Sequence, residues 1–121
     1  MKMTTTTRHV GFVTVVDITG RIVFGEESTS LGKLLSDLLS KGHNKILLNL
    51  ADVNRIDTTG LAYLISSLSS VRKRQGELKL LNPTEQVQAV MQLTKLVTVF
   101  DIKDDEAAAI RSFGESAAAT A

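Results

Sequence analysis

Two hydroxyl groups and a carboxylate lie side by side in the run Asp57-Thr58-Thr59-Gly60 of this 121-residue sequence. Asp and Thr are preferred at helix N-termini, where a side-chain oxygen satisfies a free backbone N–H, so helix capping accounts for part of the run. Capping needs only one such oxygen, however, and two hydroxyls are present. A phosphate on Thr58 would add roughly −2 charge at the positive end of a helix. The run therefore indicates a cap and, as a second hypothesis, a phosphorylation site to which Gly60 opens access.

The segments on either side of this run would hold it rigidly and leave it open to solvent. Residues 46–50 form an apolar run typical of a buried strand. Residues 59–75 follow with apolar side chains at helical spacing, and Gly76 suits the left-handed position after a helix. The apolar stripe of this predicted helix consists of Leu61, Leu64, Ile65, Leu68 and Val71.

The remaining segments predict an alternation of strands and helices. Residues rich in β-branched side chains over 10–18 and 22–24, separated by Thr19-Gly20-Arg21, indicate a β-hairpin. Leucines at helical spacing over 31–39 indicate a helix. Further strands are expected at 45–50, 77–81 and 97–102. Further helices are expected after Asn82-Pro83, with Asn82 as the N-cap, and over 104–113, with Asp104 as the cap.

This order of elements predicts an α/β fold, with a mixed β-sheet opened by a β-hairpin and about four helices packed on it. A chain of 121 residues is long enough to bury a sizeable core in one domain. We expect the domain to cover residues 8–114, between a flexible N-terminus at residues 1–7 and a flexible tail at residues 115–121.

The composition argues against several classes of protein. A formal net charge of +1 and the absence of tryptophan argue against a nucleic-acid surface built from cations and stacking aromatic rings. The absence of cysteine excludes disulfides and thiolate sites, and fits a reducing compartment. Since no apolar run is long enough to span a membrane and no secretory signal is visible, we expect a cytoplasmic protein.

Asp57 alone also fits another kind of phosphate acceptor, the aspartate of a two-component receiver domain. Such a site needs further carboxylates after the first strand to hold Mg²⁺, and this chain offers the single acid Asp17 there. His9 and His43 have no carboxylate at metal-ligand spacing and are expected on the solvated surface. No nucleophile–base pair and no phosphate-binding glycine loop is present. We therefore expect no enzyme activity, no metal and no cofactor.

The strand at residues 46–50, Asp52 and the segment Ile56-Asp57-Thr58-Thr59-Gly60-Leu61 together resemble the signature of STAS domains, and more narrowly that of the anti-sigma factor antagonists. Members of this group carry Asp-Ser-[Ser/Thr]-Gly-Leu after an Asn-Leu strand. The resemblance covers about residues 10–113, including the predicted hairpin and the segment 76–81. It implies a mixed sheet with helices on one side.

The resemblance also implies a function for each residue of the motif. In this family the first hydroxyl residue after the aspartate is phosphorylated by a partner kinase of the GHKL type, often the anti-sigma factor itself, and a PP2C-type phosphatase removes the phosphate. The unphosphorylated antagonist binds the anti-sigma factor and frees the sigma factor. Thr58 would be the phosphoacceptor, and Asp57, Thr59 and Gly60 would form the surrounding partner-binding motif. Two other roles found among relatives, a scaffold and a transporter-associated module without phosphorylation, remain alternatives.

Two positions depart from the family pattern. Thr58 stands where serine is commoner, so the acceptor carries an additional methyl group. The predicted hairpin reads Gly20-Arg21-Ile22-Val23 where many relatives have Gly-Glu-Leu-Asp, and the nearest following acids are Glu26 and Glu27. These differences predict a partner surface that is not identical to that of the relatives.

Overall fold

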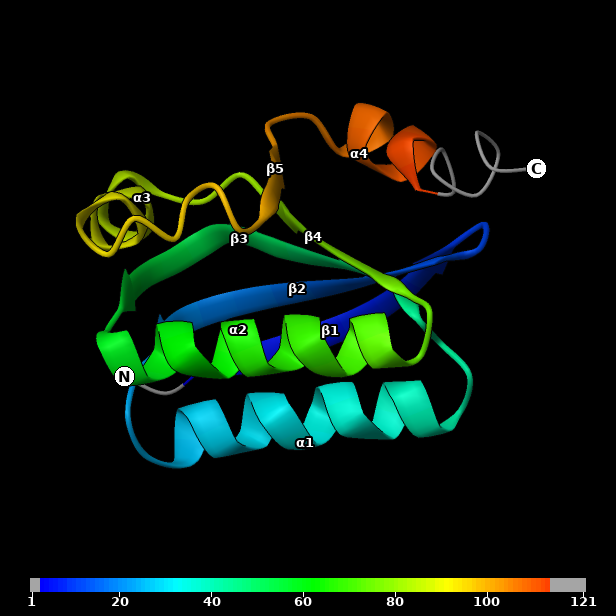
Figure 1. Cartoon of the computed structure of the whole chain (residues 1–121), viewed down its shortest axis with the longest axis horizontal. Coiled ribbons are helices and arrows are strands. Elements are labelled where there is room, and N and C mark those ends of the chain that lie inside the picture. Colours follow the sequence, from blue (N-terminus) through cyan, green and yellow to red (C-terminus); the bar gives the residue numbers. More distant parts are fainter. Residues whose placement is uncertain (1–2, 114–121) are drawn as a thin grey trace.

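A mixed sheet of five strands, in the order β1-β2-β3-β4-β5, forms the centre of the computed structural model, which describes residues 3–113 (Figure 1). The strands are β1 (Thr4–Val10), β2 (Val13–Ile22), β3 (Lys45–Ile56), β4 (Glu77–Leu81) and β5 (Asp101–Lys103). The helices are α1 (Glu26–Ser40), α2 (Thr58–Lys73), α3 (Glu85–Leu93) and α4 (Glu106–Ser112). Within these residues the predicted α/β class, with a mixed sheet and four helices, is confirmed.

The directions of the strands bring the loops after β2 and β3 together. β1 runs antiparallel to β2, whereas the pairs β2–β3, β3–β4 and β4–β5 are parallel. Because α1 connects β2 to β3 as a crossover, both strands finish at the same end of the sheet, where Ile22 pairs with Ile56. β1 starts near that end, since Thr4 pairs with Thr19. The first residues of α1 and α2 are therefore neighbours in space.

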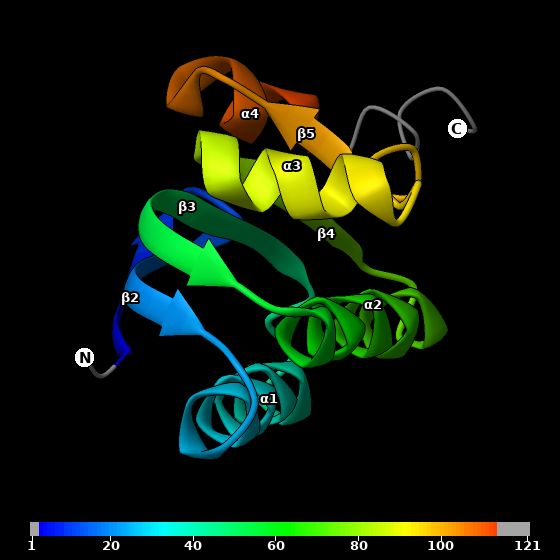
Figure 2. The same cartoon turned by 90° about the vertical axis from the view of Figure 1, so that its left-hand side faces the viewer.

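Helices pack on both faces of the sheet. Ile46, Leu48 and Leu50 of β3 belong to the larger apolar cluster, to which α1, α2 and α3 contribute. The alternate residue Leu47 lies on the opposite face and packs in a second cluster with Ala109 of α4. The expectation that helices cover one side only is therefore wrong, because α4 lies across the sheet from α1 and α2 (Figure 2). Burial on both faces explains why the consecutive residues Ile46, Leu47 and Leu48 of β3 are all apolar.

The N-terminal hairpin lies earlier in the chain than predicted. β1 includes Thr4–Thr7, so the prediction of a flexible segment at residues 1–7 is wrong for these four residues. The chain turns at Gly11, whose φ of +60° favours glycine, and Phe12, which is 92% exposed. The segment Thr19-Gly20-Arg21 is not a turn but continues β2, and the register of β2 on β3 shifts there.

The entry to α3 also differs from the prediction. Asn82 has a left-handed φ of 51° and its N–H donates to the carbonyl of Lys103 at 2.9 Å, so it belongs to the edge of the sheet and not to a helix. The N-cap residue of α3 is Thr84, and the helix begins at Glu85. The predicted cap at Asn82 is therefore wrong by two residues.

Three further boundaries move by a few residues. The last strand, predicted at 97–102, is confined to Asp101–Lys103, and α4 begins at Glu106 with Asp105, not Asp104, as its cap. The left-handed residue after α2 is Gln75 and not Gly76. The predicted tail at residues 115–121 lies outside the described residues.

Two polar anchors hold α4 against the sheet. Arg8 of β1 donates hydrogen bonds to Asp17 of β2 (Nε–Oδ2, 2.7 Å) and to Glu106 at the start of α4 (Nη1–Oε2, 3.0 Å). These bonds lower the pKa of both carboxylates and raise that of Arg8. At the other end of α4, the buried Lys79 amine donates to the carbonyl (3.0 Å) and the hydroxyl (2.8 Å) of Ser112.

Candidate functional site

The carboxylate of Asp57 caps α2 and ties this helix to the loop that follows β2. Its Oδ1 accepts a hydrogen bond from the Gly60 N–H at 2.7 Å, and its Oδ2 accepts one from the Phe24 N–H at 3.0 Å. Burial alone would raise the pKa of Asp57, but the backbone N–H groups of Phe24, Gly60 and Thr59 stabilise the charged form and lower the pKa overall. The predicted cap is thus confirmed, and it also joins two segments that lie far apart in the sequence.

Gly60 is buried, and its role differs from the one expected. A Cβ at this position would lie 2.0 Å from the carbonyl oxygen of Ile22 at the end of β2. The idea that Gly60 opens access to Thr58 is therefore wrong, because the space that it leaves is occupied by the backbone of β2. Glycine is required here for the close approach of α2 to the sheet.

The two threonines occupy different environments. Thr58 is the first residue of α2 and is exposed, so its hydroxyl is open to solvent at the positive end of the helix. Thr59 is half-buried and lines a groove between α1 and α2. The charge of Arg55 helps to lower the pKa of Asp57. Arg55 of β3 lies opposite Arg21 of β2 in the strand register. An anion on Thr58 would meet the positive end of α2 and the charge of Arg55, which oppose the repulsion from the neighbouring Asp57 carboxylate.

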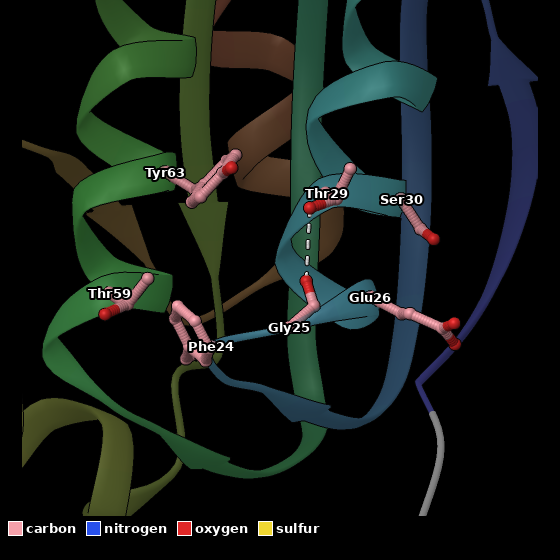
Figure 3. A pocket seen from close by; sticks show the side chains of 7 residues that line it. All are labelled: Phe24, Gly25, Glu26, Thr29, Ser30, Thr59 and Tyr63. Atoms are coloured by element: carbon pink, nitrogen blue, oxygen red, sulfur yellow. Dashed lines mark hydrogen bonds between the residues drawn. The ribbon is translucent and has the colours of Figure 1, made fainter.

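An open groove of about 600 Å³ lies beside Thr58, between the first turns of α1 and α2 (Figure 3). The Phe24 ring stands between the two helices and its residue is 77% exposed. The ring is therefore available for contact with another molecule at the mouth of the groove. The groove is lined by Phe24, Gly25, Glu26, Thr29, Ser30, Thr59 and Tyr63.

Sequence reasoning missed Phe24 and Tyr63 as site residues. The β-branched pattern predicts a strand through Phe24, although a position directly before Gly25, at the end of an apolar segment, is also typical of a loop. Tyr63 follows Thr59 by one helical turn, so it faces the same groove. Neither residue could be recognised as exposed before the packing of α1 against α2 was known.

A third missed residue, Gln86 of α3, fixes the end of β3 immediately before the motif. Its side-chain oxygen accepts from the Ile56 N–H at 2.8 Å, and its amide nitrogen donates to the Ile56 carbonyl at 3.2 Å. The hydroxyl of Thr84 donates to the Val53 carbonyl at 2.8 Å. These bonds satisfy backbone groups where β3 has no strand neighbour on that side and hold the chain that leads into Asp57.

The geometry gives no support to a receiver-type phosphate site at Asp17 or a metal site at the histidines. The Asp17 carboxylate binds Arg8 and accepts from the Asn49 amide at 2.8 Å. His9 and His43, expected on the solvated surface, have ring centroids 4.9 Å apart near the tip of the hairpin. Among residues 3–113, no group of three or more His, Cys, Asp or Glu side chains is placed to hold a metal ion. No helix in the same range is long and apolar enough to cross a membrane.

Comparisons with known proteins agree with this architecture. A candidate anti-sigma factor antagonist of Thermotoga neapolitana is 38% identical over 71 residues, which are 59% of this chain and 63% of that protein. The match thus spans less than two thirds of the length of this curated relative. The crystal structure of a candidate anti-sigma factor antagonist from Thermotoga maritima is 29% identical, with a TM-score of 0.83 over 90% of this chain and 93% of that one.

The fold also occurs in a more distant protein, SpoIIAA of Bacillus. Its phosphorylated form is 18% identical and gives a TM-score of 0.69 over 89% of this chain and 98% of that one, a likeness that shows the fold. The family model of the STAS domain matches residues 2–109, which include every strand, the first three helices and the whole 57–60 motif. The resemblance seen in the sequence is thereby confirmed, and the chain belongs to the STAS domain family.

Proposed function

We propose that this protein is an anti-sigma factor antagonist whose binding is switched by phosphorylation of Thr58. In the unphosphorylated state it binds an anti-sigma factor and so releases a sigma factor, and phosphorylation ends this binding. The observation that carries the proposal is the exposed hydroxyl of Thr58 on the first residue of α2, beside the exposed Phe24 and its groove. The names of the Thermotoga relatives support the class of partner.

The docking surface in this proposal is the groove face formed by Phe24, Thr59 and Tyr63. Covering an aromatic side chain that is mostly exposed contributes about 1.5–3 kcal/mol to binding. The hydrogen bond from the Phe24 N–H to Asp57 sets the position of the loop before the partner arrives. Less conformational entropy is then lost on binding, which favours affinity.

Phosphate on Thr58 would change the charge of this face without unfolding it. The modification adds roughly −2 charge, and the helix N-terminus and Arg55 stabilise that charge in the free protein. Against a carboxylate of the partner about 4 Å away, each added unit charge costs about 1–4 kcal/mol between water and an intermediate dielectric. Repulsion of this size lowers affinity about fivefold to several hundredfold, which is enough for a switch.

The switch requires two enzymes acting on this protein. We assign the phosphorylation to a GHKL-type kinase that uses ATP, the anti-sigma factor itself being the first candidate, and the reverse step to a PP2C-type phosphatase. The protein takes part as a substrate and a binding partner rather than as a catalyst, and we place the exchange in the cytoplasm. A kinase gene of this type beside the gene for this protein would support the assignment.

The experiment that tests the proposal combines mass spectrometry with binding. We would incubate the chain with ATP and the candidate kinase, map the modified residue, and measure the affinity of each variant for that kinase. We expect phosphate on Thr58 in the wild type and in Thr59→Val, the matched control, and none in Thr58→Ala. Thr58→Ala should bind like the wild type, and Thr58→Asp about tenfold or more weakly.

Two results would contradict the proposal. One is equal binding by Thr58→Asp and the wild type, which would refute the charge mechanism. The other is an unmodified Thr58 in the presence of a kinase that is active on another substrate. The second result would leave a STAS binding module and would favour a scaffold role.

A further inference from the structure

β1 forms an open edge of the sheet. All seven of its residues pair with β2, from Thr4 opposite Thr19 to Val10 opposite Val13, without a shift in register. On its other side, no strand or helix of the described chain lies beside it (Figure 2). An edge strand presents a row of backbone N–H and C=O groups that another strand can bind.

The two edges of the sheet are protected to different degrees. β5, at the far edge, has three residues, two of them the charged Asp101 and Lys103, and short charged edges resist further pairing. β1 has seven residues and contains no proline, and its threonines at 4–7 are exposed and uncharged. Its one permanently charged side chain, Arg8, is bound to carboxylates of β2 and α4. The usual protection against edge pairing is therefore weak at β1.

The sequence of β1 is also complementary to itself. When two identical strands pair antiparallel about a two-fold axis, the residue on the axis faces its own copy and its neighbours face each other. An axis at Thr6 places Thr6 opposite Thr6 of the second copy, and Thr5 opposite Thr7. Cross-strand threonine pairs are favourable and β-branched residues favour strands. No like charges meet along residues 4–7 in this arrangement.

We propose that β1 is a self-association edge, through which two copies of this chain pair antiparallel about Thr6 and join their sheets. The pairing uses the outer side of β1, whereas Thr58 follows the end of β3, two strands away. Both Thr58 hydroxyls therefore stay open to solvent in the dimer. This proposal does not depend on the proposed function, because it rests on a different edge of the molecule.

The first test measures mass by sedimentation equilibrium over a dilution series of the full chain. We expect the wild type to reach twice the 13.1 kDa of one chain as concentration rises. The double variant Thr5→Lys/Thr7→Lys places lysine opposite lysine in both outer pairs and should raise the dissociation constant roughly tenfold or more. The matched control Ser69→Lys/Thr98→Lys adds the same charge at exposed positions elsewhere and should behave like the wild type. A wild type that is monomeric at every concentration, or a β1 variant that dimerises like the control, would overturn the proposal.

The second test uses the absence of cysteine from the chain, so that each single-cysteine variant carries one thiol. Residues directly opposite across antiparallel strands have Cα atoms about 4.5–5.5 Å apart, within reach of a disulfide. Under mild oxidation, Thr6→Cys should form a covalent dimer faster than Thr5→Cys or the control Thr98→Cys. Equal rates in all three variants would contradict the predicted axis and the paired β1 strands.

Discussion

Helices α2 and α4 begin with the same local structure but are joined to the rest of the protein in different ways. Each is capped by an aspartate that accepts a hydrogen bond from the N–H three residues later, Asp57 from Gly60 at 2.7 Å and Asp105 from Ala108 at 2.9 Å. The Asp57 carboxylate additionally holds the backbone of Phe24, which lies 33 positions earlier. Three residues after the cap, α2 has the buried Gly60 in contact with β2, whereas α4 has Ala108.

This comparison shows that a capping aspartate does not by itself define a functional site. In α4 the cap satisfies the orphan N–H groups of one short helix. In α2 the same group is part of a junction between two loops, which fixes an exposed hydroxyl and an exposed aromatic ring relative to each other. The functional potential therefore lies in the tertiary contacts of the cap.

The largest effect on stability is expected from adding a methyl group where α2 contacts β2. Gly60→Ala forces a Cβ against the Ile22 carbonyl, 2.0 Å away, and should lower the free energy of unfolding by about 3 kcal/mol. Urea denaturation provides the measurement. Gly32→Ala is the matched control, because a Cβ there meets only the Tyr63 ring at 3.4 Å and should stabilise α1 by up to about 1 kcal/mol. Similar small effects of both changes would mean that α2 does not need its close contact with β2.

A comparison of the two caps themselves should give a smaller effect. Asp57→Ala removes the cap and the bond to Phe24, and we expect a loss of about 2 kcal/mol in the free energy of unfolding. Asp105→Ala removes a cap alone and should cost about 1 kcal/mol. Urea denaturation of both variants measures these two losses. Equal losses would show that the bond to Phe24 adds nothing to stability.

The smallest expected effect is the dependence of the α2 cap on pH. The pKa of Asp57 is lower in the folded chain than the ordinary value of about 3.9, so the charged carboxylate stabilises the fold above that value. This contribution is lost as the pH falls through the lowered pKa of the folded state. The difference in unfolding free energy between the wild type and Asp57→Asn should therefore shrink on acidification. A difference that stays constant from neutral to acidic pH would assign the role of Asp57 to its shape and not to its charge.

The interior elements could be predicted from the sequence because their burial leaves a regular pattern. The apolar stripes of α1 and α2 and the apolar run of β3 each face a core that fixes their period. β1 has no such pattern, since its four threonines are exposed and its position is set by pairing with β2. In the sequence, the run of threonines is therefore typical of a flexible N-terminal segment. Gly20 is typical of a turn, although it lies inside a long strand whose register on β3 shifts.

The same limit applies to the candidate site. Asp57 and Thr58 could be identified because capping is a local property of neighbouring residues. The requirement for glycine at position 60 could not be identified from the sequence, because the atom that a Cβ would meet is the carbonyl oxygen of Ile22, at the end of β2. The roles of Phe24 and Gln86 depend on hydrogen bonds across 33 and 30 positions of the sequence, and no local pattern indicates them.

The reversed direction of β1 has a practical consequence for attaching this protein to a sensor surface. β1 starts at the end of the sheet where Thr58 lies, whereas Val10 and Phe113 both pack against the apolar cluster that contains Val13, and α4 ends toward the tip of the hairpin (Figure 1). An attachment point at Thr4 would lie at the end of the sheet that carries the candidate docking face. An attachment point at Ser112, the last residue of α4, would leave that face turned toward the solution. The choice of attachment point therefore decides whether the candidate docking face of an immobilised sample stays accessible.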